Sequence, residues 1–254
     1  MEVTLNKNQY SIFSLVCNML KQSCQDITIN NKVVCQKINS TQCIFNFDLS
    51  NIISDDFEMV ISKLIMKYDF IQSFRDCDSV KIKVDEKNVQ ISDNSSGENR
   101  SKVLFRIADP SCIRNAFIPS DELMTVTDMS KYIKVLQANL DEKIINKMIL
   151  FANKLEADRM YFSITEENIK LEMKNMNKDN TVSAEFITIE NTINSIKKGL
   201  TAFCIDPFIL GVKPQDMELY YNPENDKMVL YLNGFIGLDE TKVNVKSWSV
   251  GRLQ

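Results

Sequence analysis

The sequence predicts an α+β protein built from two similar halves, each with two helices on one face of antiparallel strands. A helix-type apolar repeat followed by a strand hairpin occurs four times, twice on each side of residues 109–128. That middle segment contains Pro110 and Pro119 and has no sustained period. The copies share almost no sequence identity, so the repetition is one of pattern. We therefore predict an N-terminal domain at 1–108, a connector at 109–128 and a C-terminal domain at 129–254.

The clearest copy spans residues 141–174. Along 141–155, one side of the predicted helix is apolar at 3.6-residue spacing, and Leu150 is the one apolar residue that spoils this pattern. The apolar residues are Ile144, Met148, Phe151, Ala152 and Leu155. The opposite side carries Lys143, Lys147 and Lys154, together with Asn146 and Asn153. Residues 159–165 and 168–174 then alternate around Glu166-Glu167, which predicts two strands and a tight turn.

The N-terminal half is predicted to begin with a strand at 1–6 and a helix at 7–22. The apolar side of this helix consists of Ile12, Leu15, Val16, Met19 and Leu20. Its polar side, which contains no acid, consists of Lys7, Ser11, Ser14, Asn18, Lys21 and Gln22. A second helix is predicted at 62–74 with Ser62 as its N-cap. Lys63 and Lys67 share one face of it, which Phe70 and Phe74 narrow.

The remaining strands follow from alternation between turn residues. In the first half they are predicted at 26–30, 32–38, 42–49, 57–61, 79–84, 88–92 and 102–107, with Asn30-Asn31 as the first hairpin turn. In the second half they are predicted at 132–140, 181–189, 200–205, 217–222, 227–233 and 241–248. Asp206-Pro207 starts a short helix that Pro214 ends.

Composition limits the possible functions. The 254 residues are 44% hydrophobic and 25% charged, which is typical of a soluble globular protein. The net charge of −4 excludes a protein that is basic overall but allows a local basic surface. Seven cysteines form no CxxC pair, so we expect reduced, buried thiols. No apolar run is long enough to span a membrane, and we expect an intracellular protein.

No enzyme emerges from the sequence. The absence of histidine removes the commonest general base, the commonest zinc ligand and the usual serine or cysteine triad. The six glycines form no phosphate-binding loop, and no cofactor is predicted. Three acidic pairs could bind Mg²⁺, although solvated turn carboxylates are the ordinary interpretation. They are Asp55-Asp56, Asp76 with Asp78, and Glu166-Glu167.

The lysine faces carry the functional signal. A lysine stripe on a helix is usually just a solvated face. Here, however, acids avoid the same face in both 7–22 and 141–154, although the whole protein is acidic. Segregated basic faces fit a sequence-indifferent contact with phosphates. No aromatic residues alternate with these lysines, which favours a duplex backbone over stacked single strands.

The order of helices and hairpins resembles that of the DNA sliding clamps of the proliferating-cell-nuclear-antigen and T-even phage type. Residues 32–49, with VVCQKINSTQCIFNFDL, resemble the strand–loop–strand after the first clamp helix. Residues 79–110, with VKIKVDEKNVQISD and VLFRIADP, resemble the end of the phage clamp's first domain. Residues 146–174 and 206–232 resemble the helix–hairpin units of the second domain.

The resemblance implies a two-domain protomer, three copies of which close head to tail into a ring. Helices would line the hole, and edge strands near the domain ends would join the copies. It assigns loose contacts with duplex DNA to lysines on the helices, with Arg75 as a weaker candidate. These lysines are Lys7, Lys21, Lys63, Lys67, Lys143, Lys147, Lys154 and Lys213.

Clamps also bind short peptides of polymerases and other clients in a hydrophobic pocket beneath the connector. By position, the resemblance assigns this pocket to Ile38, Cys43, Leu123, Met124, Met228 and Trp248. Trp248 is the single tryptophan, and a partner-binding role and a place in the core are equally good interpretations of it. The other five residues are more typical of a core.

The leading hypothesis is a non-enzymatic sliding clamp of a phage or virus. It would act in DNA replication in the host cytoplasm, tether the replicative polymerase as a homotrimer, need a clamp loader and contact no membrane. One alternative keeps the fold in an open monomeric or dimeric processivity subunit. A protein-interaction scaffold without a DNA role and a metal-dependent enzyme that uses the acidic pairs also stay open.

Overall fold

The computed structural model describes residues 1–21, 24–38, 43–53, 57–94, 101–107, 128–157, 159–174, 183–193, 196–204, 215–237 and 239–252. The first half contains β1 (Glu2–Asn6), α1 (Lys7–Leu20), β2 (Ile27–Ile29), β3 (Val33–Ile38), β4 (Cys43–Asp48), β5 (Met59–Ile61), α2 (Leu64–Gln72), β6 (Ser79–Val84), β7 (Asn88–Asp93) and β8 (Lys102–Arg106). The second half contains β9 (Ile133–Leu140), α4 (Glu142–Leu155), β10 (Arg159–Ile164), β11 (Asn168–Lys174), β12 (Ser183–Glu190), β13 (Gly199–Cys204), β14 (Gln215–Asn222), β15 (Lys227–Ile236), η2 (Asp239–Thr241) and β16 (Val243–Arg252). The predicted connector and the short helix after Asp206 lie outside the described residues.

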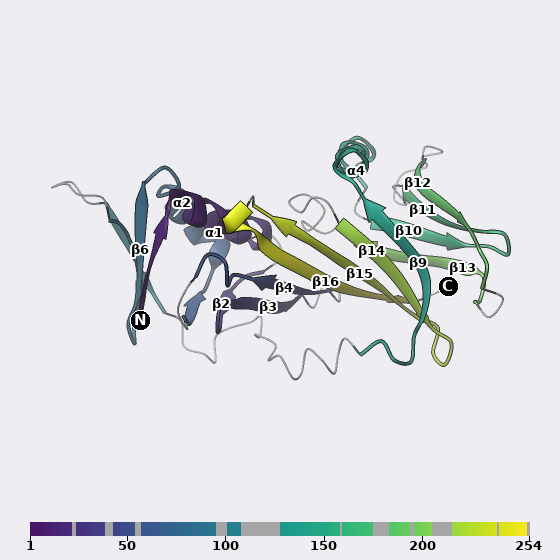
Figure 1. The fold of residues 1–254 in the computed structure, drawn as a ribbon, viewed down its shortest axis with the longest axis horizontal. Coiled ribbons are helices and arrows are strands. Elements are labelled where there is room, and N and C mark those ends of the chain that lie inside the picture. Colours follow the sequence, from purple (N-terminus) through teal and green to yellow (C-terminus); the bar gives the residue numbers. More distant parts are fainter. Residues whose placement is uncertain are drawn as a thin grey trace. The chain divides into compact units, whose positions relative to one another are not determined.

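The chain divides into two compact units (Figure 1). Unit 1 comprises Met1–Ile38, Phe45–Pro119 and Phe235–Val245, and unit 2 comprises Asn39–Ile44, Ser120–Gly234 and Lys246–Gln254. Each unit therefore takes segments from both halves of the sequence. The change from unit 1 to unit 2 at Pro119–Ser120 falls within the predicted connector. Unlike the predicted domains, however, the two units also exchange one short segment in each direction.

Antiparallel sheets form both units. In unit 1, four strands lie in the order β1-β6-β7-β8, and β2 pairs with β5. In unit 2, four strands lie in the order β12-β11-β10-β13. A six-stranded sheet has the order β3-β4-β16-β15-β14-β9. The edge strands of the four-stranded sheets are thus β1, β8, β12 and β13.

Helix α1 begins with a capping box. The side chain of Asn6 accepts a hydrogen bond from the backbone N–H of Gln9 at 3.0 Å, and the Gln9 side chain accepts one from the backbone of Asn6. Two N–H groups without partners within the helix are thereby satisfied. The capping box fixes the start of α1 at Lys7, as predicted, and the helix ends at Leu20 instead of at position 22.

The buried face of α1 differs from the predicted one. Ser14 is buried, whereas Ile12 and Leu15 are half-exposed, and the core stripe instead includes Tyr10 and Phe13. Helix α1 contacts α2 as well as strands β1 and β6. Because it packs on a sheet and on a helix, its buried arc is wider than one amphipathic stripe and is displaced from it.

Helix α2 starts two residues later than predicted. Lys63, not Ser62, is the N-cap, and it has a left-handed backbone with φ of 51°. The buried carboxylate of Asp26 accepts a hydrogen bond from the Lys63 N–H at 2.9 Å, which supports this conformation. The Ser62 hydroxyl instead accepts a hydrogen bond from Lys67 Nζ at 3.2 Å.

The first hairpin turn also moves by one residue. Asn31 and Lys32 both have positive φ, and Asn30 and Val33 exchange backbone hydrogen bonds of 2.9 and 3.0 Å on either side. This is the geometry of a two-residue hairpin turn with a left-handed backbone at both central residues. The sequence predicts Asn30-Asn31, one residue earlier, as the two central residues of this turn.

Helix α4 confirms the helix predicted at 141–155. The Asp141 side chain caps it by accepting a hydrogen bond from the Ile144 N–H at 2.7 Å. Its buried residues are Ile145, Met148, Ala152 and Leu155. Ile144 and Phe151 are half-exposed, so the apolar stripe is centred on Ile145, which the sequence pattern missed. Leu150 is exposed, as its place outside the predicted stripe implied.

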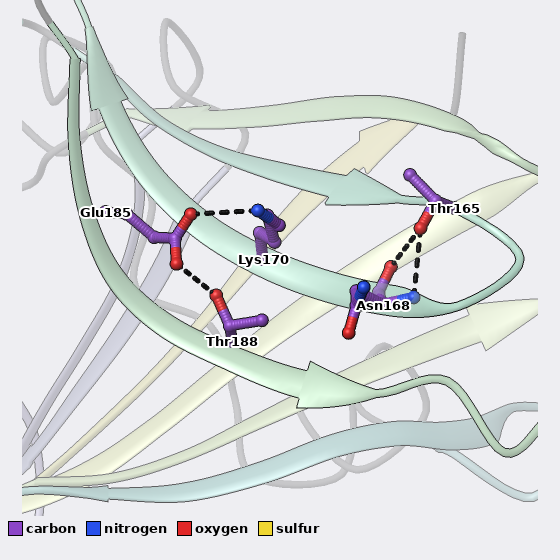
Figure 2. Close-up of polar contacts among 5 residues, drawn as sticks. All are labelled: Thr165, Asn168, Lys170, Glu185 and Thr188. Atoms are coloured by element: carbon purple, nitrogen blue, oxygen red, sulfur yellow. Dashed lines mark hydrogen bonds and ion pairs between the residues drawn. The ribbon is translucent and has the colours of Figure 1, made fainter.

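The hairpin after α4 is tied together at its turn and along its strands. Figure 2 shows the Thr165 hydroxyl bonded to the backbone of Asn168 in both directions, at 2.9 and 3.0 Å. On the same sheet, Lys170 of β11 pairs with Glu185 of β12 at 3.0 Å, and the Thr188 hydroxyl donates to the same carboxylate. The pKa of Glu185 is lowered by the hydrogen bonds from Thr188 and Lys170.

The prediction of buried thiols holds for four of the five cysteines whose burial the structure describes. Cys17, Cys24, Cys35 and Cys43 are buried without disulfides, and Cys77 is half-buried. Burial raises the pKa of Cys17, which makes it an inert core residue.

Candidate nucleic-acid interface

A basic groove lies between α1 and α2 in unit 1. Two adjoining hollows of about 260 and 380 Å³ form it, and both are lined by Ser11, Gln72 and Arg75. The larger hollow also reaches Lys7, Asn8 and Asp76, and the smaller reaches Lys21, Asn18 and Tyr68. The charged lining therefore consists of three cations and one acid. We call this surface the α1–α2 groove.

Arg75 lies at the middle of the groove, where the two hollows meet. Its Nε–H donates a hydrogen bond to the hydroxyl of Ser11 at 3.0 Å. This bond joins α1 to the residues just after α2. The terminal guanidinium nitrogens keep N–H donors that suit an anion. Arg75 is the weaker candidate from the sequence, yet in the structure a hydrogen bond to Ser11 holds it in a defined position in the groove.

Lys21 lies at the other hollow, at the end of α1. Its Nζ is 3.8 Å from the centroid of the Tyr68 ring, a cation–π contact between the two helices. Tyr68 is 6% exposed, so the ring forms a fixed floor beneath the charge. Neither Tyr68 nor Ser11 was singled out from the sequence. Ser11 lay on the predicted polar face, but only the fold places it beside Arg75.

The two lysines of α2 behave differently from each other. Lys63 is exposed at the start of the helix. Lys67 is half-buried, with its Nζ bonded to Ser62 and 5.4 Å from the Phe105 ring centroid. Burial lowers the pKa of Lys67, an effect that the carboxylate of Asp26 opposes. Of the two, Lys63 is better placed for a phosphate in solution.

Helix α4 presents the basic face of unit 2. Lys143, Lys147 and Lys154 are all exposed, as are Asn146 and Asn153 between them. Within the described ranges, none of the three lysines forms an ion pair. Their charged ends are therefore hydrated and accessible to an anion. Lys213, the last DNA-binding candidate, lies outside the described residues.

The acidic pairs do not form a metal site in the described part of the chain. No group of three or more side chains there could hold a metal ion. Glu166 pairs with Lys198, whose hydrogen bond lowers the pKa of that carboxyl. Asp76 and Asp78 are exposed, and Asp55-Asp56 lies outside the described residues. None of the helices in the described ranges is long and apolar enough to span a bilayer.

The candidate peptide-binding residues fall into three groups. Leu123, Met124 and the side chain of Ile38 lie outside the described residues. Cys43 and Met228 are 1% and 0% exposed, and Cys43 Sγ accepts a hydrogen bond from the Ser249 hydroxyl at 3.1 Å. Such burial gives a partner no access to either side chain, in agreement with the core interpretation.

Trp248 differs from the rest of that set because it is half-exposed. Its ring packs beside Tyr231 of β15, with centroids 5.4 Å apart. Both residues belong to unit 2. The pair forms an aromatic surface on neighbouring strands, and Tyr231 is a member that the sequence did not indicate.

Comparison with known proteins identifies the fold. No protein-family model and no curated sequence matches the chain. Solved structures do. Proliferating cellular nuclear antigen from Entamoeba histolytica aligns at a TM-score of 0.61 and 12% identity over 99% of this chain and 98% of its own. PCNA from Thermococcus kodakaraensis aligns at 0.61 and 11% identity over 99% of both chains. A chain of the PCNA2–PCNA3 complex from Sulfolobus tokodaii aligns at 0.61 and 12% identity over 100% of both.

These matches span whole chains, so they cover both halves of the sequence at once. The protein therefore has the sliding-clamp fold, and the predicted α+β clamp architecture is confirmed. At this level of identity the likeness concerns the fold alone.

Proposed function

We propose that the protein is a sliding clamp that encircles duplex DNA and tethers a replicative polymerase of a phage or virus. The observation that carries the proposal is the basic helix surface in each unit of a clamp fold. In unit 1, Lys7, Lys21 and Arg75 line the α1–α2 groove, and in unit 2 three lysines cover the exposed face of α4. Cations on both units of an acidic chain fit a polyanion that touches both.

The type of contact favours sliding over specific binding. The cations contact phosphates, which carry no sequence information. A ring holds its DNA by topology, so each contact can be weak and exchange rapidly. Flexible lysines suit this role because their ammonium groups stay hydrated and bind as point charges.

Ring closure needs two different surfaces on each protomer, and the edge strands of the four-stranded sheets provide candidates. Strand β8 of unit 1 carries exposed Lys102 and Arg106, with Leu104 60% exposed between them. Strand β12 of unit 2 carries exposed Glu185 and Glu190. A basic edge and an acidic edge complement each other between copies but not with themselves. Pairing β8 of one copy with β12 of the next gives a head-to-tail interface that can close.

Client peptides are assigned to the Trp248–Tyr231 surface. Aromatic residues that keep part of their area exposed are common anchors of interfaces. A loader and the polymerase are expected partners of this surface. The chain itself is proposed to be non-enzymatic.

The experiment that tests encirclement uses DNA ends. A ring threads onto a linear duplex through a free end, so it should be captured by a bead-bound duplex with an open end. Blocking that end with a bulky protein beforehand should abolish capture, and blocking it afterwards should make capture resistant to competitor DNA. An open processivity subunit would bind both substrates equally, and a scaffold without a DNA role would bind neither.

The solution mass provides the second arm. A ring of three copies would have three times the 29.2 kDa mass of the chain. If the protein is a monomer or dimer and binds duplexes with blocked and open ends equally well, the open processivity subunit is supported instead of the ring.

A further inference from the structure

Two of the three groove cations differ from the α4 lysines in how they are held. Arg75 is bonded to Ser11 across the two helices, and Lys21 lies on the Tyr68 ring. The α4 lysines make no ion pair within the described ranges. Both anchors belong to unit 1 and involve uncharged partners, so neither neutralises the cation that it holds.

We infer that Ser11 and Tyr68 are positioning residues that hold Arg75 and Lys21 ready for phosphates in the α1–α2 groove. The inference rests on the proposed function and adds that the two basic surfaces contact DNA in different ways. Arg75 and Lys21 provide directed contacts from fixed positions, and the α4 lysines provide diffuse attraction.

The physical basis is the cost of ordering a long side chain. Immobilising an arginine or lysine side chain costs rotamer entropy. An anchor that acts before DNA arrives removes part of that cost from the binding step. A carboxylate anchor would do the same but would cancel the charge. A hydroxyl and an aromatic ring order the cation and leave its charge for the phosphate.

The geometry also sets where the charges lie. Lys7 and Lys21 are separated by 14 residues of helix, about 21 Å at 1.5 Å per residue. The bond to Ser11 holds Arg75 level with the first part of α1, between the two lysines. The groove therefore presents three separated cations instead of a single cluster, so several phosphates can be contacted at once.

Ser11→Ala is the direct test because it keeps every charge. Alanine is a better helix former than serine, so the fold should not weaken. Loss of the hydrogen bond should reduce the affinity for a short blunt duplex about two- to fivefold. The slope of log affinity against log salt should stay unchanged, whereas Arg75→Gln should reduce its magnitude by about 0.9.

A double-mutant cycle separates positioning from a merely structural role. In an Arg75→Gln chain, Ser11→Ala should have no further effect on duplex affinity. Ser73→Ala is the matched control, because the Ser73 hydroxyl donates to the backbone carbonyl of Phe70 and bonds to no cation among the described residues. That variant should bind as the wild type does. Equal effects of Ser11→Ala with and without Arg75 would overturn the inference.

Tyr68 is tested in the same way with two substitutions. Tyr68→Phe keeps the ring and should keep the affinity, while Tyr68→Leu should weaken binding two- to fivefold, with an effect that vanishes in a Lys21→Gln chain. If Ser11→Ala and Tyr68→Leu bind duplex with wild-type affinity while Arg75→Gln binds it more weakly, the positioning role is refuted and the proposed function is not. If the wild type fails to bind duplex DNA at every salt concentration, the proposed function itself is refuted.

Discussion

The hydroxyl of Tyr10 on α1 donates a hydrogen bond to the backbone carbonyl of Ile71 on α2, at 2.7 Å and away from solvent. Tyr10 is 0% exposed, and its burial raises the pKa of the phenol well above the ordinary range. The phenol therefore stays protonated and can donate this bond at neutral pH. The bond ties together the two helices that form the α1–α2 groove.

Tyr10→Phe should lower the free energy of unfolding by about 1 kcal/mol, because the Ile71 carbonyl loses its buried donor. The loss is moderate since the N–H of Phe74 also approaches that carbonyl, at 3.4 Å. Urea unfolding at fixed protomer concentration measures it. Tyr132→Phe is the control, since Tyr132 is half-exposed and should change stability by less than about 0.5 kcal/mol.

Gly251 of β16 has no room for a side chain. A Cβ atom there would lie 2.8 Å from Thr201 Oγ1 and 3.2 Å from a ring carbon of Phe203. Gly251→Ala should therefore destabilise the protein by about 1–3 kcal/mol through overpacking. Thermal unfolding under fixed conditions checks this expectation.

Thr201 offers the matching rescue. Its buried hydroxyl makes no hydrogen bond within the described residues. Thr201→Ala removes the atom that the new methyl group would meet, so the double variant should be more stable than the sum of the two single effects predicts. Strict additivity would show that the crowding lies elsewhere.

Glu218 of β14 gives a prediction about pH. Burial alone would raise its pKa, but hydrogen bonds from Lys134 and Tyr220 lower it overall. A folded-state pKa below the unfolded one means that this cluster stabilises the protein at neutral pH and ceases to do so as the pH falls through the folded value. Glu218→Gln should thus be less stable than the wild type at neutral pH, and the difference should shrink in acid. A difference independent of pH would contradict the assigned charge.

The sequence predicted element types well and helix orientation less well. Every described strand was anticipated within a few residues, because alternation and turn residues are local signals. Ser14 shows where local signals stop. Its polarity placed it on the solvent face of α1, but packing of α1 against α2 buries it. No pattern in one segment specifies that second partner.

The sequence predicts the exposure of most candidate lysines but not the contacts that the groove cations make. Lys7, Lys63 and the α4 lysines are exposed because burial of an unpaired ammonium group would be costly. The anchors of Arg75 and Lys21 are 64 and 47 positions away in sequence, beyond the reach of any periodicity. Lys67 was grouped with Lys63 by spacing, yet Ser62 and Phe105 hold it half-buried.

Reversing two charges on α4 tests the DNA contact of unit 2. Lys143→Glu with Lys147→Glu should weaken duplex capture and polymerase stimulation without changing stability, because both side chains are exposed and without an ion pair in the described ranges. The matched control is Lys83→Glu with Lys87→Glu, which changes the net charge equally on exposed positions of β6 and its turn. Equal loss in both pairs would mean that only net charge matters.

Trp248→Ala tests the aromatic surface of unit 2. It should weaken binding of a short peptide of the client polymerase at least tenfold, because such anchors often contribute about 2 kcal/mol or more. Isothermal titration measures the affinity. Tyr231→Ala should also weaken binding, and Met228→Ala should reduce stability instead, since that side chain is fully buried. Native peptide affinity in Trp248→Ala would remove this surface from the proposal.

The edge strands make the last prediction, on assembly. Lys102→Glu with Arg106→Glu would place an acidic β8 against the acidic β12 of the next copy, so the mass in solution should fall from trimer to monomer. Adding Glu190→Lys to the same chain should restore part of the trimer. Glu185 is left in place, because Lys170 and Thr188 already hold it within the sheet (Figure 2). Mixing the Lys102→Glu/Arg106→Glu chain with a Glu190→Lys chain should give contacts between unlike chains but no fully matched ring of three, since alternating partners cannot close an odd ring. Trimers that survive the β8 reversal unchanged would place the interface on other strands.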